Sequence, residues 1–322
     1  MNMLRFMVRR VLSGLVVIWV VTTATFFLFF KAVPEQAVAR LLAGKAASPQ
    51  VLHTVARNLG LTQPILVQYW HFLGRLVHGN LGKSYYLQEP VTTVIKQFLP
   101  VTVSLVIGGV LLWLIVGLAV GIISATRARS LFDRISTAGV LAGVSAPTFV
   151  VGQLLLLLVF LPLSKTAFHW ISQTPASIGN GFGKWSGYFV LGWVTLAIVQ
   201  AAVYTRLSRG SLLDTLGEDY IRTARAKGLS ERRVLYRHAL RSALTPVVSQ
   251  LGVDLGALLG GVLVVEQVFG FQGLGFETVQ SIFRGDTPVV LGTVILATFF
   301  VALCNLIVDM LYGVLDPRVR II

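Results

Sequence analysis

The sequence predicts an all-α integral membrane protein with six transmembrane helices and both termini in the cytoplasm. Of its 322 residues, 55% are hydrophobic and 12% are charged. The mean hydropathy of +0.78 is higher than an ordinary water-soluble domain needs. A hydrocarbon core about 30 Å thick takes about 20 apolar residues per helical span. Six runs of this kind cover residues 11–30, 101–123, 135–163, 188–204, 246–268 and 289–315.

The first run completes an N-terminal region, residues 1–30, that we interpret as a short cytoplasmic tip followed by a membrane anchor. The run is uncharged and follows three arginines, a pattern that secretory signal peptides share. The apolar part of a signal peptide has about 7–15 residues, whereas this run has about 20. We therefore expect an uncleaved anchor, although Ala37 and Ala39 resemble a cleavage site.

The third run, residues 135–163, is longer than one span needs and contains Pro147. Proline lacks a backbone N–H group and interrupts the hydrogen bonds of a helix. We expect either a kink at this position or a short separate segment.

The distribution of lysine and arginine indicates the orientation, because short loops rich in these residues stay in the cytoplasm. With the N-terminus inside, the cytoplasmic segments hold 17 of the 27 basic residues, and the short outer loops, residues 165–187 and 269–288, hold three. The net charge of +14 fits retention at an anionic membrane surface better than nucleic-acid binding. The single cysteine, Cys304, lies in the last run, so no intrachain disulfide is expected.

Residues 31–100 form a polar outer segment that is too long for a simple connection. Two stretches, residues 49–59 and 64–77, have apolar residues at helical spacing, and Gly60 separates them. We interpret the segment as amphipathic helices that cap the membrane helices. Docking of a soluble partner is an added role for this surface.

The remaining residues, 101–322, form the core domain, and its cytoplasmic segment 205–242 carries nine basic residues. A helical pattern in this segment stops at Gly228, and Ser230 can cap a second helix over residues 231–244. A helix, a glycine break and a second helix at a membrane surface form a rigid protrusion.

The first helix of this protrusion has a face that carries small residues and a basic face. Ile221, Ala224 and Gly228 share the first face, where small side chains permit close approach of a partner's backbone. The basic residues are Arg222, Arg225 and Lys227. A basic amphipathic helix also suits lipid headgroups. These residues alone leave open whether the protrusion docks a protein or lies on the membrane.

A contiguous motif in this helix resembles a motif of a known family, and this resemblance favours docking of a protein over binding to the membrane surface. The motif consists of Glu218, Asp219, Tyr220, Ile221, Arg222, Thr223, Ala224, Arg225, Ala226, Lys227, Gly228 and Leu229. It resembles the cytoplasmic coupling loop in the permeases of bacterial dipeptide, oligopeptide and nickel ABC importers. The resemblance implies the type I importer permease fold. It also implies that residues 218–228 sit in a cleft of an ATPase subunit and transmit its closure to the membrane helices.

The resemblance extends over almost the whole chain. Matching positions are Leu59 to Leu61, Pro64, Gln68, Tyr69, Gly79 to Gly82, Ser84, Pro90, Val91, Asp133, Arg134, Ser145, Pro147, Phe149, Gly152, Glu266, Val268, Phe269, Gly273 to Gly275, Asp309 and Leu315 to Arg318. The long outer segment indicates the first of the two permease types. Asn80 and Gln272 depart from the pattern, since the family usually has Asp and Pro there, and Arg222 stands where the general importer motif has Glu.

The same resemblance implies the partners of the chain. They are a second permease subunit, two ATP-binding subunits or domains, an extracytoplasmic substrate-binding protein and a peptide substrate, all at the bacterial plasma membrane. ATP and magnesium are then expected on the ATPase subunits and no cofactor on this chain. Consistent with this, residues 179–184 imitate a phosphate loop but lack its first glycine and its hydroxyl residue.

Three acidic residues lie within apolar runs. Inserting a charged side chain at the centre of a membrane costs about 2.5–3.5 kcal/mol, so such a residue tends to face a cavity or a partner. For Glu266 and Asp309 we favour pairing with another helix or interfacial snorkelling. For Asp254, two roles stay open: lining the translocation pathway, where it could meet a peptide's amino terminus, or an interhelical hydrogen bond. Asp254 and Glu266 are the candidate pathway residues, and no catalytic residue or metal ligand is predicted.

Two other function classes have less support. An intramembrane aspartyl protease would use Asp254 and Asp309, but such enzymes need a glycine directly before the aspartate, where this chain has Val253. A self-sufficient secondary transporter or channel would leave the basic protrusion unexplained. The sequence does not distinguish dipeptide, oligopeptide, glutathione-like or nickel-complex cargo.

Overall fold

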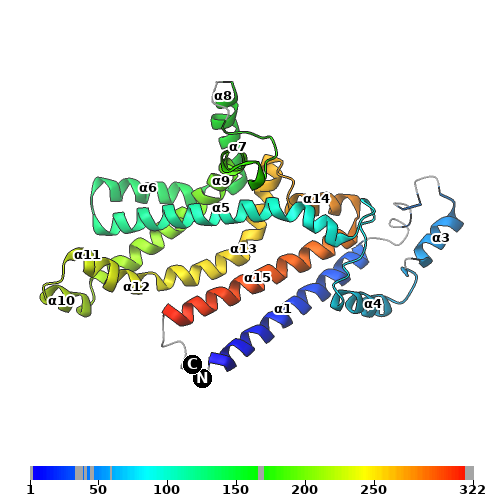
Figure 1. Ribbon diagram of the computed structural model, residues 1–322, viewed down its shortest axis with the longest axis horizontal. Helices are drawn as coiled ribbons and strands as arrows, with labels where there is room; N and C mark the ends of the chain where they lie inside the picture. Colours follow the sequence, from blue (N-terminus) through cyan, green and yellow to red (C-terminus); the bar gives the residue numbers. More distant parts are fainter. Residues whose placement is uncertain are drawn as a thin grey trace. The chain divides into compact units, whose positions relative to one another are not determined.

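The computed structural model describes residues 3–32, 39, 42–43, 47–58, 60–165 and 170–315 (Figure 1). Among these residues the regular structure is helical, apart from one isolated bridge between Lys83 and Pro90. The elements are α1 (Met3–Ala32), α3 (Pro49–Asn58), α4 (Ile65–Val77), α5 (Val91–Thr126), α6 (Leu131–Ser145), α7 (Thr148–Leu155), η1 (Leu156–Phe160), α8 (Leu161–Ser164), η2 (Ile178–Asn180), α9 (Phe182–Leu216), α10 (Asp219–Ala226), α11 (Glu231–Arg233), η3 (Val234–Ala239), α12 (Leu240–Ala243), α13 (Thr245–Phe269), α14 (Leu274–Arg284) and α15 (Thr287–Leu315).

Four of the described helices are long and apolar enough to cross a membrane. They are Val8–Phe29 within α1, α5, α9 and Thr287–Val308 within α15. Two bent pairs raise the number to six if each pair counts as one span: α6 with Thr148–Ser164, bent by 106°, and the two halves of α13, bent by 52°. The break expected at Pro147 is confirmed, because α6 ends at Ser145 and Pro147 is the N-cap of α7.

The helices extend beyond the apolar runs that the sequence reveals. The run 188–204 lies inside α9, which ends at Leu216, and the run 101–123 lies inside α5, which begins at Val91. A helix continues past its apolar part as long as nothing disrupts its backbone hydrogen bonds, so hydropathy marks the buried portion and not the ends. The segment that follows the fourth run therefore begins as a continuation of a membrane helix.

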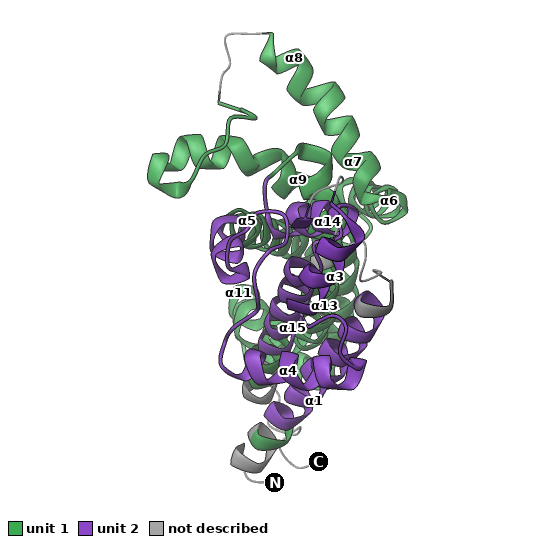
Figure 2. Cartoon of the chain, turned by 90° about the vertical axis from the view of Figure 1, so that its right-hand side faces the viewer, with its two compact units in different colours: residues 1–9, 101–271, 304–322 green, residues 10–100, 272–303 purple. Residues whose placement is uncertain are grey.

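The chain divides into two compact units, coloured green and purple in Figure 2. Unit 1 comprises residues 1–9, 101–271 and 304–322, and unit 2 comprises residues 10–100 and 272–303. Unit 1 has an aromatic core in which α5, α9 and α13 meet. Its fully buried large side chains include Trp113, Tyr204, Phe189 and Phe271. In unit 2, the core contains Phe26, Tyr69, Phe72, Leu291 and Ile295, from α1, α4 and α15.

Glycines on α5 bring this helix very close to α9 within unit 1. A Cβ atom added at Gly121 would lie 1.9 Å from the Ser208 hydroxyl oxygen, and one at Gly117 would lie 2.7 Å from the Tyr204 Cβ. The spacing of four residues places both glycines on one helix face. The contact depends on their having no side chain, because any Cβ would force the helices apart.

Candidate functional site

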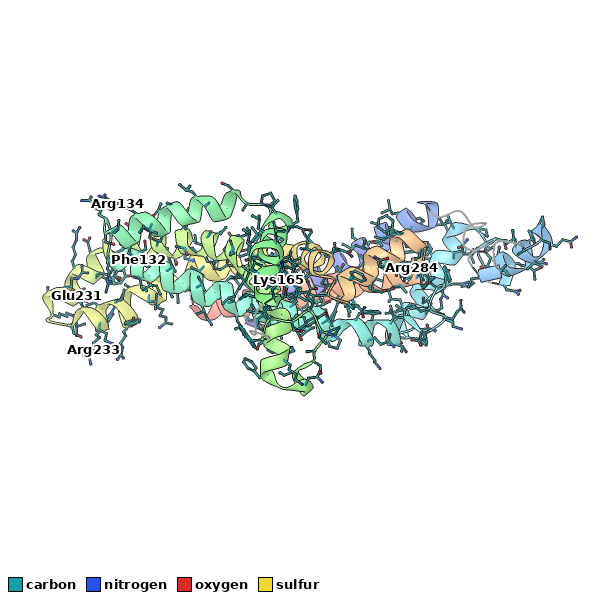
Figure 3. All side chains as sticks on the ribbon, turned by 90° about the horizontal axis from the view of Figure 1, so that it is seen from above. Phe132, Arg134, Lys165, Glu231, Arg233 and Arg284 are labelled. Carbon is teal, nitrogen blue, oxygen red and sulfur yellow. The ribbon has the colours of Figure 1, made fainter. Side chains whose placement is uncertain are left out.

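The predicted protrusion is an ordered structure that we call the basic elbow, residues 217–243. It begins at Gly217, the C-cap of α9, and contains α10, a turn at Gly228, and the continuous succession α11, η3 and α12. Ser230 occupies the predicted N-cap position of α11, but its side chain forms no capping hydrogen bond with the described residues. Figure 3 labels Glu231 and Arg233 in the elbow and Arg134 near the start of α6, at the same end of unit 1.

One face of α10 is buried against the rest of unit 1. Ile221 is fully buried and Ala224 is 7% exposed, and both belong to a cluster with Leu212 of α9 and Val234 of η3. This corrects the prediction that Ala224 offers a small-residue surface to a partner, because its small side chain instead permits close packing inside the elbow. Gly228, expected on the same face, is exposed.

The turn after α10 is fixed by backbone hydrogen bonds and an ion pair. Gly228 has a φ of +76°, a conformation that glycine adopts without strain. The Leu229 N–H donates to the Ala224 carbonyl at 3.4 Å and the Gly228 N–H to the Arg225 carbonyl at 2.9 Å, the pattern of a Schellman motif. Across the turn, the Arg225 guanidinium contacts both carboxylate oxygens of Glu231, at 2.8 and 3.2 Å.

The opposite face of α10 is exposed and carries the remaining motif residues. Tyr220 is 45% exposed, a large fraction for an aromatic side chain. Arg222, paired with Asp219 at 3.4 Å, has 73% of its side chain exposed. The other exposed members are Glu218, Thr223, Ala226 and Lys227. This face combines an aromatic anchor with basic groups, the composition of a protein-binding surface.

A bidentate ion pair connects α6 to α9 in unit 1 near the elbow. The Arg209 Nε and Nη2 atoms donate to the two Asp133 carboxylate oxygens at 2.6 and 2.8 Å. The Ser124 hydroxyl and the Arg129 N–H also donate to this carboxylate. Sequence reasoning noted Asp133 but missed Arg209, because no periodic pattern connects residues that are 76 positions apart.

Asp254 lies in a polar cluster inside unit 1. Its Oδ1 atom accepts a 3.0 Å hydrogen bond from Gln250 Nε2 one turn earlier in α13. Its Oδ2 atom, the Tyr204 hydroxyl and the Trp113 Nε1 atom are buried and have no hydrogen-bond partner among the described residues. The Tyr204 hydroxyl is close enough to Asp254 to interact with it electrostatically, and the Trp113 and Tyr204 rings are 6.2 Å apart. The two roles predicted for Asp254 remain open.

Glu266 differs from Asp254 because it is fully buried among helices. The Thr102 hydroxyl of α5 donates to its Oε1 atom at 2.6 Å. In this structure Glu266 therefore faces neighbouring helices instead of an open pathway, which agrees with the pairing that we favoured and weakens its candidacy as a pathway residue. The side chain of Asp309, in α15, lies outside the described part of the structure.

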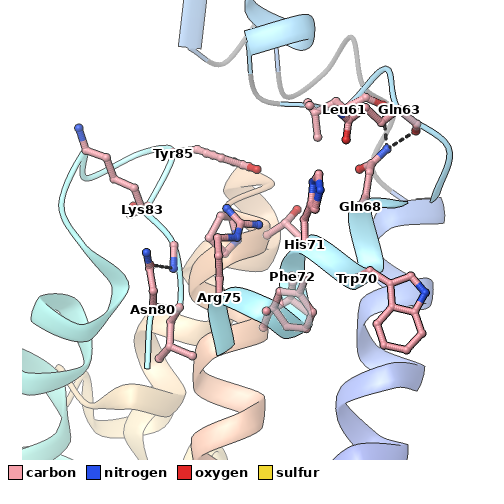
Figure 4. A pocket seen from close by; sticks show the side chains of 18 of the residues that line it. Leu61, Gln63, Gln68, Trp70, His71, Phe72, Arg75, Asn80, Lys83 and Tyr85 are labelled. Carbon is pink, nitrogen blue, oxygen red and sulfur yellow. Dashed lines mark hydrogen bonds between the residues drawn. The ribbon is translucent and has the colours of Figure 1, made fainter. Parts of the chain in front are cut away.

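Unit 2 contains a hollow of about 770 Å³ between α4 and the loop that follows it (Figure 4). We call it the outer hollow, because most of its lining belongs to the predicted outer segment 31–100, and one of its walls is the turn of residues 82–90, which is anchored on Asp286. The Asp286 carboxylate accepts hydrogen bonds from the Ser84 hydroxyl at 2.5 Å, the Tyr85 N–H at 3.0 Å and the Tyr86 N–H at 3.1 Å. Ser84 and Asp286 are each 1% exposed.

Asn80, the residue that departs from the family pattern, lines this hollow. Its side-chain oxygen accepts a 2.9 Å hydrogen bond from the Gly82 N–H. An aspartate would accept the same bond, so asparagine preserves the local geometry and removes a negative charge.

Comparison with known proteins identifies the class that this fold and elbow define. Residues 117–321 match the family described as the inner membrane component of binding-protein-dependent transport systems, and residues 3–106 match the N-terminal region of such components. The chain belongs to this family. It is a permease subunit of an ABC importer in the inner membrane, a transport subunit and not a catalytic enzyme. The assignment made from the coupling-loop motif is thereby confirmed.

The relatives of the chain include permease proteins whose names state a cargo. It is 38% identical over 319 residues to the glutathione transport system permease protein GsiC of Escherichia coli (strain K12), which covers 99% of each chain. The GsiC proteins of Shigella boydii serotype 4 (strain Sb227) and Shigella flexneri serotype 5b (strain 8401) show the same identity and coverage.

Proposed function

We propose that this chain forms half of the translocation pathway of an ATP-driven peptide importer and is coupled to the ATPase subunits through residues 218–228. The second half would come from another permease subunit, and a substrate-binding protein would deliver the peptide. ATP and magnesium would bind to the partner ATPase subunits or domains. The observation that carries the proposal is the basic elbow: α10 is anchored on one face and presents the motif residues on the other.

The anchoring suits a rigid-body mechanism. Ile221 and Ala224 join α10 to the end of α9, and the pair formed by Arg225 and Glu231 joins it to α11. A partner that moves α10 would therefore move the attached membrane helix, instead of only bending a loop. Such motion would drive alternating access, with both termini and the elbow in the cytoplasm and residues 31–100 outside.

Peptide cargo is the finer part of the proposal. The GsiC relatives support it because glutathione is a tripeptide. The test is uptake into liposomes that contain the two permeases, the ATPase subunits and the binding protein. Concentrative uptake of glutathione or another short peptide is expected only with ATP, and uptake that is unchanged without the ATPase subunits would contradict the proposal.

A matched pair of glycine variants tests the coupling surface. Gly228 and Gly181 both have positive φ values, and neither has an atom within 4 Å of an added Cβ. Gly228→Trp places a bulky, strained residue in the elbow and should abolish ATPase association, whereas Gly181→Trp lies next to η2 in the proposed outer loop and should preserve it. Insertion into the membrane should be normal in both. ATPase binding and transport by Gly228→Trp at the unsubstituted level would remove the coupling role.

A further inference from the structure

The outer hollow of unit 2 has a lining of unusual charge. Its described lining residues include Arg75 and Lys83, two histidines and several side-chain amides, and none of them is an aspartate or glutamate. The nearby Asp286 carboxylate is buried behind the wall, where it accepts hydrogen bonds from Ser84, Tyr85 and Tyr86. Arg75 and His71 rise from α4 towards the hydroxyl end of Tyr85, and Lys83 stands at the rim (Figure 4). Because the charged side chains that line the hollow are cationic and the Asp286 carboxylate is already bound by three donors, the lining favours an anionic ligand.

Arg75 is the cation best placed to bind such a ligand. Its side chain forms none of the ion pairs found among the described residues, and it is exposed to the hollow. Burial raises the pKa of the neighbouring Tyr85 to about 12, against a smaller lowering by Arg75, so the phenol keeps its proton at neutral pH. A guanidinium and a neutral phenol together offer donors to one carboxylate.

The hollow also contains fixed acceptors. The Gln68 amide nitrogen donates to the carbonyls of Leu61 and Gln63 at 2.9 and 2.8 Å, and the Gln88 amide nitrogen donates to the Tyr85 carbonyl at 2.7 Å. These bonds turn the amide nitrogens of both side chains towards backbone carbonyls and leave the amide oxygens able to accept. Acceptors beside a cation suit a ligand that has N–H groups close to a carboxylate.

We propose that the outer hollow is a subsite for the carboxylate end of a peptide substrate, with Arg75 binding the carboxylate and the Gln68 and Gln88 oxygens accepting from peptide N–H groups. This inference rests on the proposed peptide function and on the outward placement of residues 31–100. Inorganic phosphate and phosphatidylglycerol have no N–H groups, so either could use the cation but neither could supply N–H donors to the two amide oxygens.

The chain itself offers an isosteric test of the charge. Asn80→Asp keeps the acceptor for the Gly82 N–H and adds a carboxylate to the lining, so it should preserve the fold and repel an anionic ligand. Arg75→Gln removes the proposed partner. The matched controls are Asn58→Asp and Arg57→Gln, the same chemical changes at exposed positions of α3 that do not line the hollow.

The experiment measures binding of glutathione, and of glutathione with both carboxylates amidated, to the full-length chain in phosphatidylcholine nanodiscs. We expect the chain to prefer the free acid. Arg75→Gln should weaken binding about tenfold, as expected for loss of a charge-assisted hydrogen bond. Asn80→Asp should weaken it roughly threefold, as expected for a like charge in a partly exposed site. Both controls should bind as the unsubstituted chain does.

Four results would overturn the subsite. They are absence of binding by the unsubstituted chain, equal binding of the amidated peptide, unchanged affinity in both Arg75→Gln and Asn80→Asp, and displacement by inorganic phosphate or by phosphatidylglycerol in the nanodisc at concentrations similar to those of the peptide. Uptake by the assembled importer is scored separately. Peptide uptake without carboxylate-selective binding would refute only the subsite, whereas selective binding without uptake would refute only the proposed transport function.

Discussion

Replacement of Asp286 by asparagine should release the turn that forms one wall of the outer hollow. The carboxylate accepts three hydrogen bonds: Tyr85 N–H reaches Oδ1, and Ser84 Oγ and Tyr86 N–H reach Oδ2. Asparagine has only one side-chain oxygen. Its best orientation keeps the two bonds at Oδ2 and turns the amino group towards the Tyr85 N–H, so that two donors face each other.

The expected loss follows from these contacts. A buried N–H left without an acceptor costs about 1–3 kcal/mol, and a hydrogen bond to a neutral acceptor is weaker than one to a charged acceptor by about 1 kcal/mol. One orphaned donor at about 1–3 kcal/mol and two bonds weakened by about 1 kcal/mol each then give about 3–5 kcal/mol in the stability of the turn. Because the donors belong to residues 84–86, the change should be local to residues 82–90.

Amide hydrogen exchange of the full-length chain in nanodiscs measures this local opening. A loss of about 3 kcal/mol, the lower end of this range, corresponds to roughly 150-fold faster exchange, and the amide of Tyr85 should respond most. Glu89→Gln is the control, because it removes one negative charge from an exposed side chain in the same turn. Exchange at Tyr85 and Tyr86 within about threefold of the unsubstituted chain in Asp286→Asn would refute the role of the carboxylate as an anchor.

Three further predictions concern other contacts. Ile221→Ala should destabilise the elbow by about 2–4 kcal/mol, because it opens a cavity in a fully buried cluster, and should uncouple transport. Tyr220→Ala should instead weaken ATPase binding while hydrogen exchange in the elbow stays as slow as in the unsubstituted chain. Gly121→Ala should lower the unfolding midpoint in detergent because its Cβ would lie 1.9 Å from a hydroxyl of α9, and Gly139→Ala, with no atom within 4 Å, should not. Burial raises the pKa of the Glu277 carboxyl above its usual value of 4.5, so folding stability should fall as pH rises through that raised pKa. In a series of unfolding measurements at different pH, Glu277→Gln should flatten this decline.

The helical architecture follows from local features that a sequence displays directly. Apolar runs and helix-stopping residues such as Pro147 and Gly228 act within a few positions, so they could be interpreted without a structure. The ends of the helices were harder to predict from the sequence, because α9 continues through polar residues as far as Leu216. The elbow was predicted as two helices with a break because its signals are also local.

Pairings between distant residues could not be predicted in the same way. Arg209 and Asp133 lie 76 positions apart, and Ser84 and Asp286 lie 202 apart. Ala224 was assigned to an external partner because a helical pattern shows that a face is apolar without showing what covers it. In the structure, other parts of unit 1 cover that face.

The length of α9 means that a small rotation at the elbow produces a large displacement at the other end of the helix. At 1.5 Å of rise per residue, its 35 residues extend about 52 Å, more than the thickness of a membrane. A tilt of about 5° applied at the end that joins the elbow would displace the far end by roughly 4–5 Å, a distance comparable to one helical turn. In the proposed coupling, a modest movement of the ATPase subunit at the elbow would become a displacement of several ångströms at the opposite end of this one long helix.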